Sequence, residues 1–317
     1  MQNKRRRTLA VLVPAFLAVL LSCGENPSEP EPWPDGAYFY LGAAGYSDTA
    51  VAWSPTGNVM LYTSGVYGDP DLFAYDRITD PVTVSSTSMD ESVGPVGCWT
   101  DQTNPGLIIF TATDRDSVVH TEVRTITGNL WAMEIILDDS LPHLHPTWSA
   151  DADTVLLCTK VDGRWSMYAA SYPPQEEHLE PQEFYAPQAD VLRPSYSPQG
   201  DWILFESRSG GQGDVWVIRP DGSDPRAVVE GPADECHPCW SPYQGWFVYS
   251  SDASGQYELY VTDLSADTTI RLTDDPASDV YPAWNPGIES IVFCSDRVEG
   301  EGLYDILAID EPDLPDD

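Results

Sequence analysis

Basic residues are scarce in this 317-residue chain, which has 15 Lys and Arg against 51 Asp and Glu and a formal net charge of −36. Four of the 15 lie between Lys4 and Arg7, which leaves 11 further along, and Lys160 is the only lysine among those 11. A surface with this balance repels phosphate backbones, so nucleic acid is excluded as a partner. The acidity is typical of a soluble protein, of a salty or calcium-rich habitat, or of a protein with a basic partner.

Two catalytic signatures are also missing from the sequence, Gly-x-Ser-x-Gly and His-Glu-x-x-His. The first marks the nucleophile turn of α/β hydrolases and the second marks zinc proteases. No stretch shows helical periodicity; apolar residues, 42% of the chain, gather in short runs rich in Val, Ile, Trp and Tyr. We therefore expect an all-β protein that is not an enzyme and has no catalytic residues.

Cysteine is uncommon, and its six copies do not form an evident metal site. Cys236 and Cys239 flank His237, but no second ligand pair is evident nearby, so we expect no bound metal or other cofactor. Whether these two cysteines form a disulfide is left open. Four cysteines occupy matching positions in the repeat described below, Cys98 with Cys239 and Cys158 with Cys294. This match predicts that they are small buried packing residues.

The N-terminus has the three parts of a secretion signal. Lys4–Arg7 is charged, Leu9–Leu21 is apolar, and Leu20-Leu21-Ser22-Cys23 ends the segment. The apolar run is too short for a stable spanning helix. The ending resembles the lipobox of bacterial lipoproteins, which implies a signal peptide at residues 1–22 and lipid attachment at Cys23.

Residues 23–35 then form a Pro- and Glu-rich tether that holds the following domain away from the bilayer. Gly24 rather than Asp follows the cysteine, and by resemblance to enterobacterial sorting this favours the outer membrane. We expect a protein in the cell envelope, lipid-anchored and monomeric, on the periplasmic face or the cell surface. The membrane leaflet is not specified by the sequence.

A single unit recurs along the rest of the chain. Its best-formed copy, Arg193–Glu230, reads as four short strands separated by Gly- and Asp-containing turns. An aromatic residue followed by a small polar residue, usually with Pro-x-Gly, begins each copy at intervals of 44 to 49 residues: Trp53, Trp99, Trp148, Tyr196, Trp240 and Trp284. This period with four strands is typical of propeller blades, so we predict a six-bladed β-propeller with four antiparallel strands per blade over residues 36–310.

The sixth copy has only three strands before the acidic tail at residues 311–317. The strand-like run Ala37–Leu41 precedes the first copy and has no anchor of its own. Because an open ring would leave unpaired strand edges, we expect this N-terminal strand to close the last blade.

The repeat, with its Pro-x-Trp-Ser-Pro-x-Gly anchors and the closing Arg271-Leu272-Thr273 of the fifth copy, resembles the TolB-type propeller, a relative of WD-repeat propellers. The likeness covers about residues 37–310. It implies a fold shared by periplasmic interaction proteins, prolyl peptidases and oligogalacturonate lyases, so function must be argued from the site. The small α/β domain that precedes the ring in TolB itself has no counterpart in this sequence.

Candidate binding residues gather where each anchor enters the innermost strand, close to the ring axis. The residue before the proline is His145, Arg193, His237 or Tyr281, and three aspartates lie slightly upstream: Asp190, Asp234 and Asp279. In TolB-like rings this channel mouth receives partner peptides, so the resemblance implies a protein or peptide partner there. The alternative is that these residues satisfy backbone groups or form salt bridges at the rim.

A carbohydrate-binding or polysaccharide-lyase-like ring is the alternative function. It would use histidines and a metal at the same mouth, with His145, His237 and His143 as candidates. Paired aspartates in or beside turns leave weak calcium sites open, although Asp also favours turns for its own sake: Asp69 and Asp71, Asp114 and Asp116, and Asp151 and Asp153. The primary expectation is a membrane-anchored, non-catalytic scaffold for protein or peptide.

Overall fold

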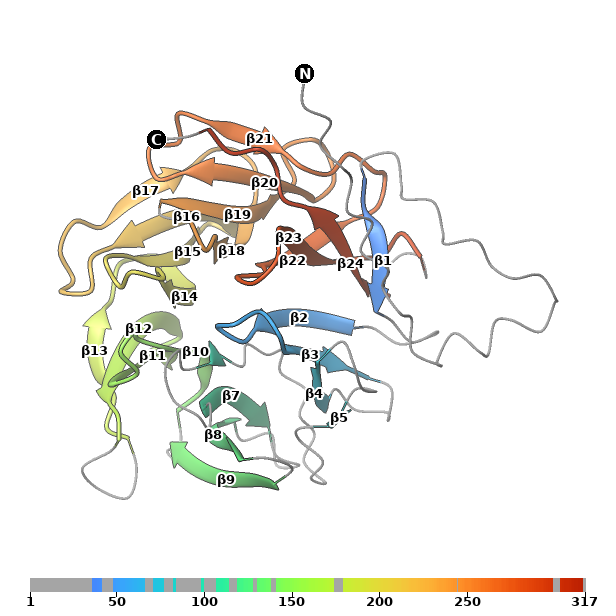
Figure 1. The fold of residues 1–317 in the computed structure, drawn as a ribbon. Coiled ribbons are helices and arrows are strands. Elements are labelled where there is room, and N and C mark those ends of the chain that lie inside the picture. The colour runs from blue at the N-terminus through green and yellow to red at the C-terminus, as the bar shows by residue number, and fades with distance from the viewer. Residues whose placement is uncertain are drawn as a thin grey trace.

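The computed structural model describes residues 36–41, 48–65, 71–76, 82–83, 98–99, 107–113, 119–127, 130–137, 141–173, 179–243, 245–298 and 303–315. Their regular elements are 24 strands, β1–β24, which pair into six antiparallel four-stranded sheets around a common axis (Figure 1). Within those residues no helix is long and apolar enough to cross a membrane.

Each sheet follows the chain outward from the axis, and we number the sheets by the sequence copies that form them. The first contains β2 (Asp48–Trp53), β3 (Met60–Ser64), β4 (Asp71–Tyr75) and β5 (Val82–Thr83); the second β6 (Cys98–Trp99), β7 (Leu107–Thr113), β8 (Val119–Thr127) and β9 (Leu130–Leu137); the third β10 (His143–Trp148), β11 (Thr154–Val161), β12 (Arg164–Ser171) and β13 (Gln182–Tyr185). The fourth contains β14 (Asp190–Tyr196), β15 (Ile203–Ser209), β16 (Gln212–Ile218) and β17 (Arg226–Val229); the fifth β18 (Glu235–Trp240), β19 (Trp246–Ser251), β20 (Glu258–Asp263) and β21 (Thr269–Arg271); the sixth β22 (Asp279–Trp284), β23 (Ser290–Ser295), β24 (Asp305–Asp310) and β1 (Tyr38–Leu41).

The prediction of six blades is wrong, because within the described residues only five of the six sheets form complete blades. Blades one, three, four, five and six each have an innermost strand of six or seven residues, interrupted by a register shift. The second sheet has only the two-residue strand β6 at this position, paired with β7 at two positions. The anchor of this copy is degenerate, because Trp99-Thr100 is not followed by the proline and glycine found in copies such as Trp53-Ser54-Pro55-Thr56-Gly57.

The anchor motif forms a tight turn between the first and second strands. In blade four the backbone N–H of Ser197 donates to the carbonyl of Trp202 at 2.8 Å, and the Trp202 N–H donates back to the Ser197 hydroxyl at 3.1 Å. Gly200 closes this turn with a φ of 75°, in the left-handed region that glycine adopts without strain. The small polar residue is therefore a cap for the turn, which is why it recurs after each aromatic anchor.

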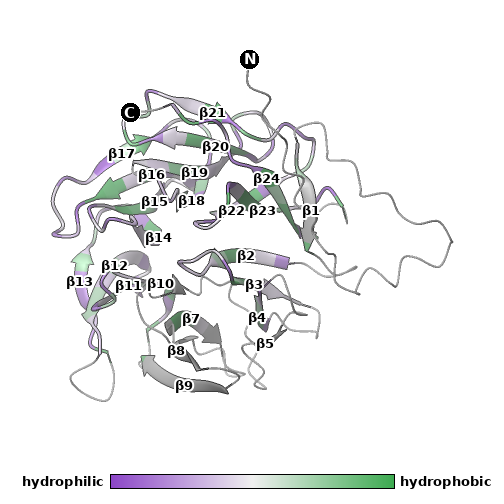
Figure 2. Ribbon diagram, viewed as in Figure 1, coloured by the Kyte–Doolittle hydropathy of each residue, from purple (hydrophilic) through white to green (hydrophobic). Residues whose placement is uncertain are grey.

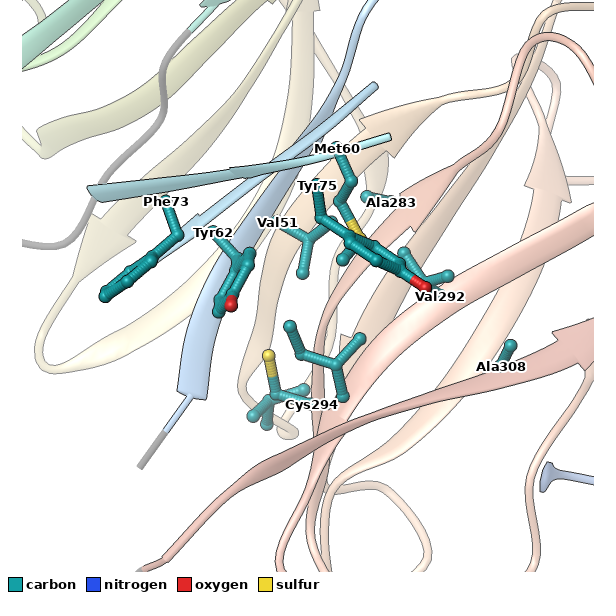
Figure 3. Close-up of a cluster of buried hydrophobic side chains, with 11 residues drawn as sticks. Val51, Met60, Tyr62, Phe73, Tyr75, Ala283, Val292, Cys294 and Ala308 are labelled. Atoms are coloured by element: carbon teal, nitrogen blue, oxygen red, sulfur yellow. The ribbon is translucent and has the colours of Figure 1, made fainter. Parts of the chain in front are cut away.

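The hydrophobic core is divided among the interfaces between neighbouring sheets. In β23, Ile291 and Phe293 pack against blade five, while Val292 and Cys294 pack against blade one. Figure 3 shows the cluster between blades one and six. Because both faces of such a strand are buried, the middle strands are nearly continuous hydrophobic runs (Figure 2).

The ring closes through the N-terminal strand, as the unpaired edge of the sixth copy predicts. β1 pairs antiparallel with β24, with Tyr38 opposite Ala308 and Phe39 opposite Leu307. The innermost strands of neighbouring sheets also contact one another all the way around the axis. The first described strand and the last one therefore lie in the same sheet, so closure depends on both ends of the domain.

Candidate functional site

The four predicted pre-proline residues all occupy the same backbone conformation. Each lies in the register shift of its innermost strand, with a φ of 52° or 53°: His145, Arg193, His237 and Tyr281. This left-handed region is unusual for residues with a side chain, and such residues cluster at binding and catalytic sites. The bulge turns the strand at one equivalent point in four consecutive blades.

Their side chains form one continuous cluster. The Arg193 guanidinium contacts His145, with Nη1 3.1 Å from Nε2, and its Cζ lies 5.2 Å from the centre of the Tyr281 ring. The rings of Tyr281 and His237 are 3.9 Å apart between centroids, at 32° to each other. Because Arg193 belongs to blade four and Tyr281 to blade six, which are not neighbours, their contact places the cluster at the axis. We call these four residues the axial cluster.

Both histidines of the axial cluster are held neutral. Burial lowers the pKa of His145, and the nearby Arg193 charge lowers it further. Burial also lowers the pKa of His237, with additional repulsion from Arg193 and Arg208. A neutral imidazole has one acceptor nitrogen, so His145 can accept from either the backbone N–H or the guanidinium of Arg193, but not from both at once.

A buried carboxylate that the sequence analysis missed lies beneath this cluster. Glu206 in β15 is 1% exposed, and its Oε2 is 3.6 Å from Arg193 Nε and accepts from the backbone N–H of His237 at 3.3 Å. Its other oxygen accepts from Arg208 Nε. One signal in the sequence could have identified Glu206: four other blades have a small residue at the equivalent position. These residues are Thr63, Cys158, Ser250 and Cys294.

The two arginines on Glu206 differ in how many of their donors are used. Arg208 donates to Glu206, to the Gly211 carbonyl at 3.1 Å and to the Asp234 carboxylate. Arg193 is 22% exposed, and within the described residues no group accepts from its Nη2. Arg193 is therefore the cation of the site that has donors available.

The three predicted aspartates lie outside the axial cluster. Asp190 accepts from the backbone N–H of Trp165 at 2.9 Å, in the hairpin of blade three. Asp234 accepts in the same way from Gly213 of blade four, at 2.6 Å. Asp279 is fully buried and pairs with Arg297 of its own blade. Asp190 and Asp234 tie neighbouring blades together, and Asp234 is linked to the axial cluster through Arg208 and Glu206.

Three of the four cysteines with described side chains pack as small buried residues, and the fourth, Cys239, is half-buried. Cys236 and Cys239 are thiols and not a disulfide, and Cys158, Cys236 and Cys294 are almost fully buried. The Cys236 sulfur is 3.3 Å from Nδ1 of His237. Burial raises the pKa of this thiol well above its ordinary value, so it is not a thiolate nucleophile. Cys98 is described only by its backbone.

Other candidates have structural contacts or fall outside the described part of the chain. His143 is buried, and its Nδ1 lies 3.0 Å from the Thr159 hydroxyl. Ser149 donates to Asp151 at 2.7 Å within a turn. In the ranges that the structure describes, no three His, Cys, Asp or Glu side chains are grouped so that they could hold a metal ion. Three aspartates and the lipid attachment residue lie outside these ranges: Asp69, Asp114, Asp116 and Cys23.

Comparison with known proteins adds structural neighbours only, because no family model and no curated protein matches the sequence. TolB from Acinetobacter baumannii is similar with a TM-score of 0.63 and 16% sequence identity, over 75% of this chain and 57% of that chain. A putative TolB from Agrobacterium tumefaciens is similar with a TM-score of 0.61 and 18% identity, over 84% of this chain and 90% of that chain. The chain folds as a TolB-like β-propeller.

The TolB-like fold also occurs in enzymes. An oligogalacturonate lyase from Vibrio parahaemolyticus has a TM-score of 0.54 and 12% identity, over 87% of this chain and 99% of that chain. At such identities the likeness is one of fold, so function is argued from the axial cluster. This TolB-like propeller spans 57% of the length of the Acinetobacter protein.

Proposed function

We propose that this TolB-like propeller is a non-catalytic scaffold of the bacterial cell envelope that binds a protein or peptide partner at the axial cluster. The contact between Arg193 and Tyr281 across the axis carries this proposal, because it joins side chains of non-neighbouring blades into one surface. Four residues held in a costly backbone conformation at one point support a role beyond packing.

The chemistry of the cluster favours binding over catalysis. The pKa of both histidines lies well below its ordinary value, which makes the imidazoles weak bases, and the buried thiol of Cys236 is protonated. The fixed charges, Glu206 and Arg208, already neutralise each other through short contacts. What the cluster offers a partner is a flat ring surface, Tyr281 with His237, beside the guanidinium of Arg193.

The envelope location rests on the N-terminal sequence and on the fold of the neighbours. A lipid on Cys23 and the Pro- and Glu-rich segment at residues 23–35 would hold the ring at a membrane surface, with the outer membrane favoured. Replacing Cys23 with Ser tests this. We expect the native protein in the membrane fraction and the Cys23→Ser variant in the soluble fraction; equal membrane association of both would contradict the lipid anchor.

Crosslinking and affinity capture from membranes test the binding role. The native chain is compared with a quadruple alanine variant of the axial cluster and with Arg219→Ala as a matched control, since Arg219 stacks on Trp202 away from the cluster. We expect the quadruple variant to lose partners that the control retains, while circular dichroism shows both folded. Recovery of the same partners by all three proteins would refute the proposal. Metal-dependent binding of acidic oligosaccharides would favour the lyase-like alternative.

A further inference from the structure

Building on the proposed function, we propose that Arg193 is a carboxylate-binding residue, which recognises a carboxylate of the partner polypeptide. The guanidinium has an outer edge formed by Nη1 and Nη2. Nη1 uses at most one of its two hydrogens on His145, and Nη2 uses neither on any described residue. A carboxylate matches such an edge with two parallel hydrogen bonds.

The surroundings hold this edge in place before any ligand arrives. Glu206 lies on the Nε side at 3.6 Å, and His145 lies 3.1 Å from Nη1. The Tyr281 ring stacks against the guanidinium, with its centre 5.2 Å from Cζ. A side chain fixed on three sides loses little conformational entropy when it binds, which raises affinity for a given contact.

The other polar groups of the site cannot take this role. The donors of Arg208 are already engaged by Glu206, Gly211 and Asp234. The imidazole of His237 lies over Tyr281 and meets the sulfur of Cys236 with Nδ1. An incoming acceptor therefore finds Arg193 as the one cationic donor of the axial cluster with hydrogens to spare.

Charge favours a carboxylate over a phosphate group. Glu206 lies directly behind the guanidinium, and the chain has a formal net charge of −36. A phosphate would bring up to two negative charges into this field, whereas a carboxylate brings one. A polypeptide can also carry basic residues that the acidic surface attracts, so its acidic group is delivered by favourable long-range forces.

The carboxylate can come from a chain end or from an acidic side chain, and small probes separate the two. We would titrate four acetylated tripeptides: trialanine with a free C-terminus, its C-terminal amide, and two amides with Glu or Gln in the middle. Binding is followed by the NMR signal of the Arg193 guanidinium, assigned by its loss in Arg193→Lys. Glucuronate serves as the acidic sugar probe.

We expect at least one carboxylate peptide to bind about tenfold or more tightly than its neutral partner, as for a charge-assisted hydrogen-bond pair. Arg193→Lys should lose this preference because it lacks the planar edge, and Arg219→Lys should keep it. If Arg193→Lys does not fold, Arg193→Gln with Glu206→Gln removes both members of the buried pair and serves instead.

Four outcomes would overturn the inference. One is equal binding of acids and amides, another is a preference that persists in Arg193→Lys, and a third is absence of peptide binding up to about 10 mM, well above a millimolar dissociation constant. Binding of glucuronate alone would also overturn it in favour of an acidic sugar. If partner capture still depends on the axial cluster in any of these cases, the proposed function stands and only the carboxylate inference fails.

Discussion

Replacing Glu206 with Ser tests whether the buried carboxylate organises the axial cluster. Serine is the residue that blade five has at the equivalent position, Ser250, so the backbone there accepts it. The change removes the counter-ion of Arg193 and Arg208 and the acceptor of the His237 N–H. All three groups would remain in a largely buried environment.

The structure sets the size of the expected loss. Removing one partner of a buried ion pair costs about 3–5 kcal/mol, because the other charge is left uncompensated. The side chains of Arg193 and Arg208 are 22% and 28% exposed, so water reaches both in part, and Arg208 keeps Asp234. We therefore expect the free energy of unfolding to fall by about 3 kcal/mol, the lower end of that range.

Urea unfolding at neutral pH, followed by tryptophan fluorescence, measures this loss. Ser250→Ala is the matched control, and we expect it to change stability by less than about 0.5 kcal/mol. Arg193→Met added to Glu206→Ser should recover part of the loss, giving a coupling of about 1 kcal/mol or more in a double-mutant cycle. A loss below about 1 kcal/mol for Glu206→Ser, or strictly additive effects, would refute the proposed role of Glu206.

Three further predictions concern residues other than the four of the axial cluster. Burial, together with Asp214, raises the pKa of Glu235 to about 7. The folded protein therefore keeps a proton that the unfolded chain releases above about pH 4.5, and the free energy of unfolding falls as the pH rises from about 4.5 to about 7. Glu235→Gln should therefore be more stable than the native protein by about 1–3 kcal/mol at about pH 8 and similar at about pH 4.5 in urea unfolding; equal stability at both pH values would contradict this. Gly287→Ala should lower stability by about 1–3 kcal/mol, because its Cβ would lie 2.4 Å from a blade-one carbonyl oxygen, whereas Gly231→Ala, with open space around it, should not. Deleting residues 36–41 should lower the melting temperature of the whole domain by removing β1 from the sixth sheet, and an unchanged melting temperature would show that closure does not need β1.

Local features of the fold could be read from the sequence because each copy repeats the same chemistry. The capped turn depends on an aromatic residue, a serine and a glycine close together, as in Tyr196-Ser197 with Gly200. The pre-proline residues belong to the same motif, and their place at the entry to each innermost strand predicts that the side chains of the axial cluster meet near the ring axis. Closure by the N-terminal strand also followed, because three strands at one end needed a fourth at the other.

Features that depend on departures from the repeat, or on cross-strand register, could not be predicted in this way. The short innermost strand of the second sheet departs from the repeat, since β6 has two residues where the other innermost strands have six or seven. Predicting Glu206 at the site would have required the pairing register of β14 and β15, because this register brings Glu206 opposite Leu192, next to the bulge. The aspartates were assigned to the site by their position in sequence, but Asp190 and Asp234 accept from the backbone of the preceding blade.

The asymmetry of the ring restricts the orientation that the proposed partner can take at the axial cluster. The bulge of blade one is formed by Ala50 and Val51, which have no proline after them and carry no polar side-chain group. Blades three to six supply the four side chains of the axial cluster, and blade four alone supplies the buried carboxylate and Arg193. A symmetric ring would present the same groups in every direction and could bind a partner in several equivalent orientations. Among the described residues, the charged and aromatic groups of the axial cluster come from blades three to six and differ from blade to blade, so we expect a partner that contacts Arg193 to be held in one orientation relative to the blades.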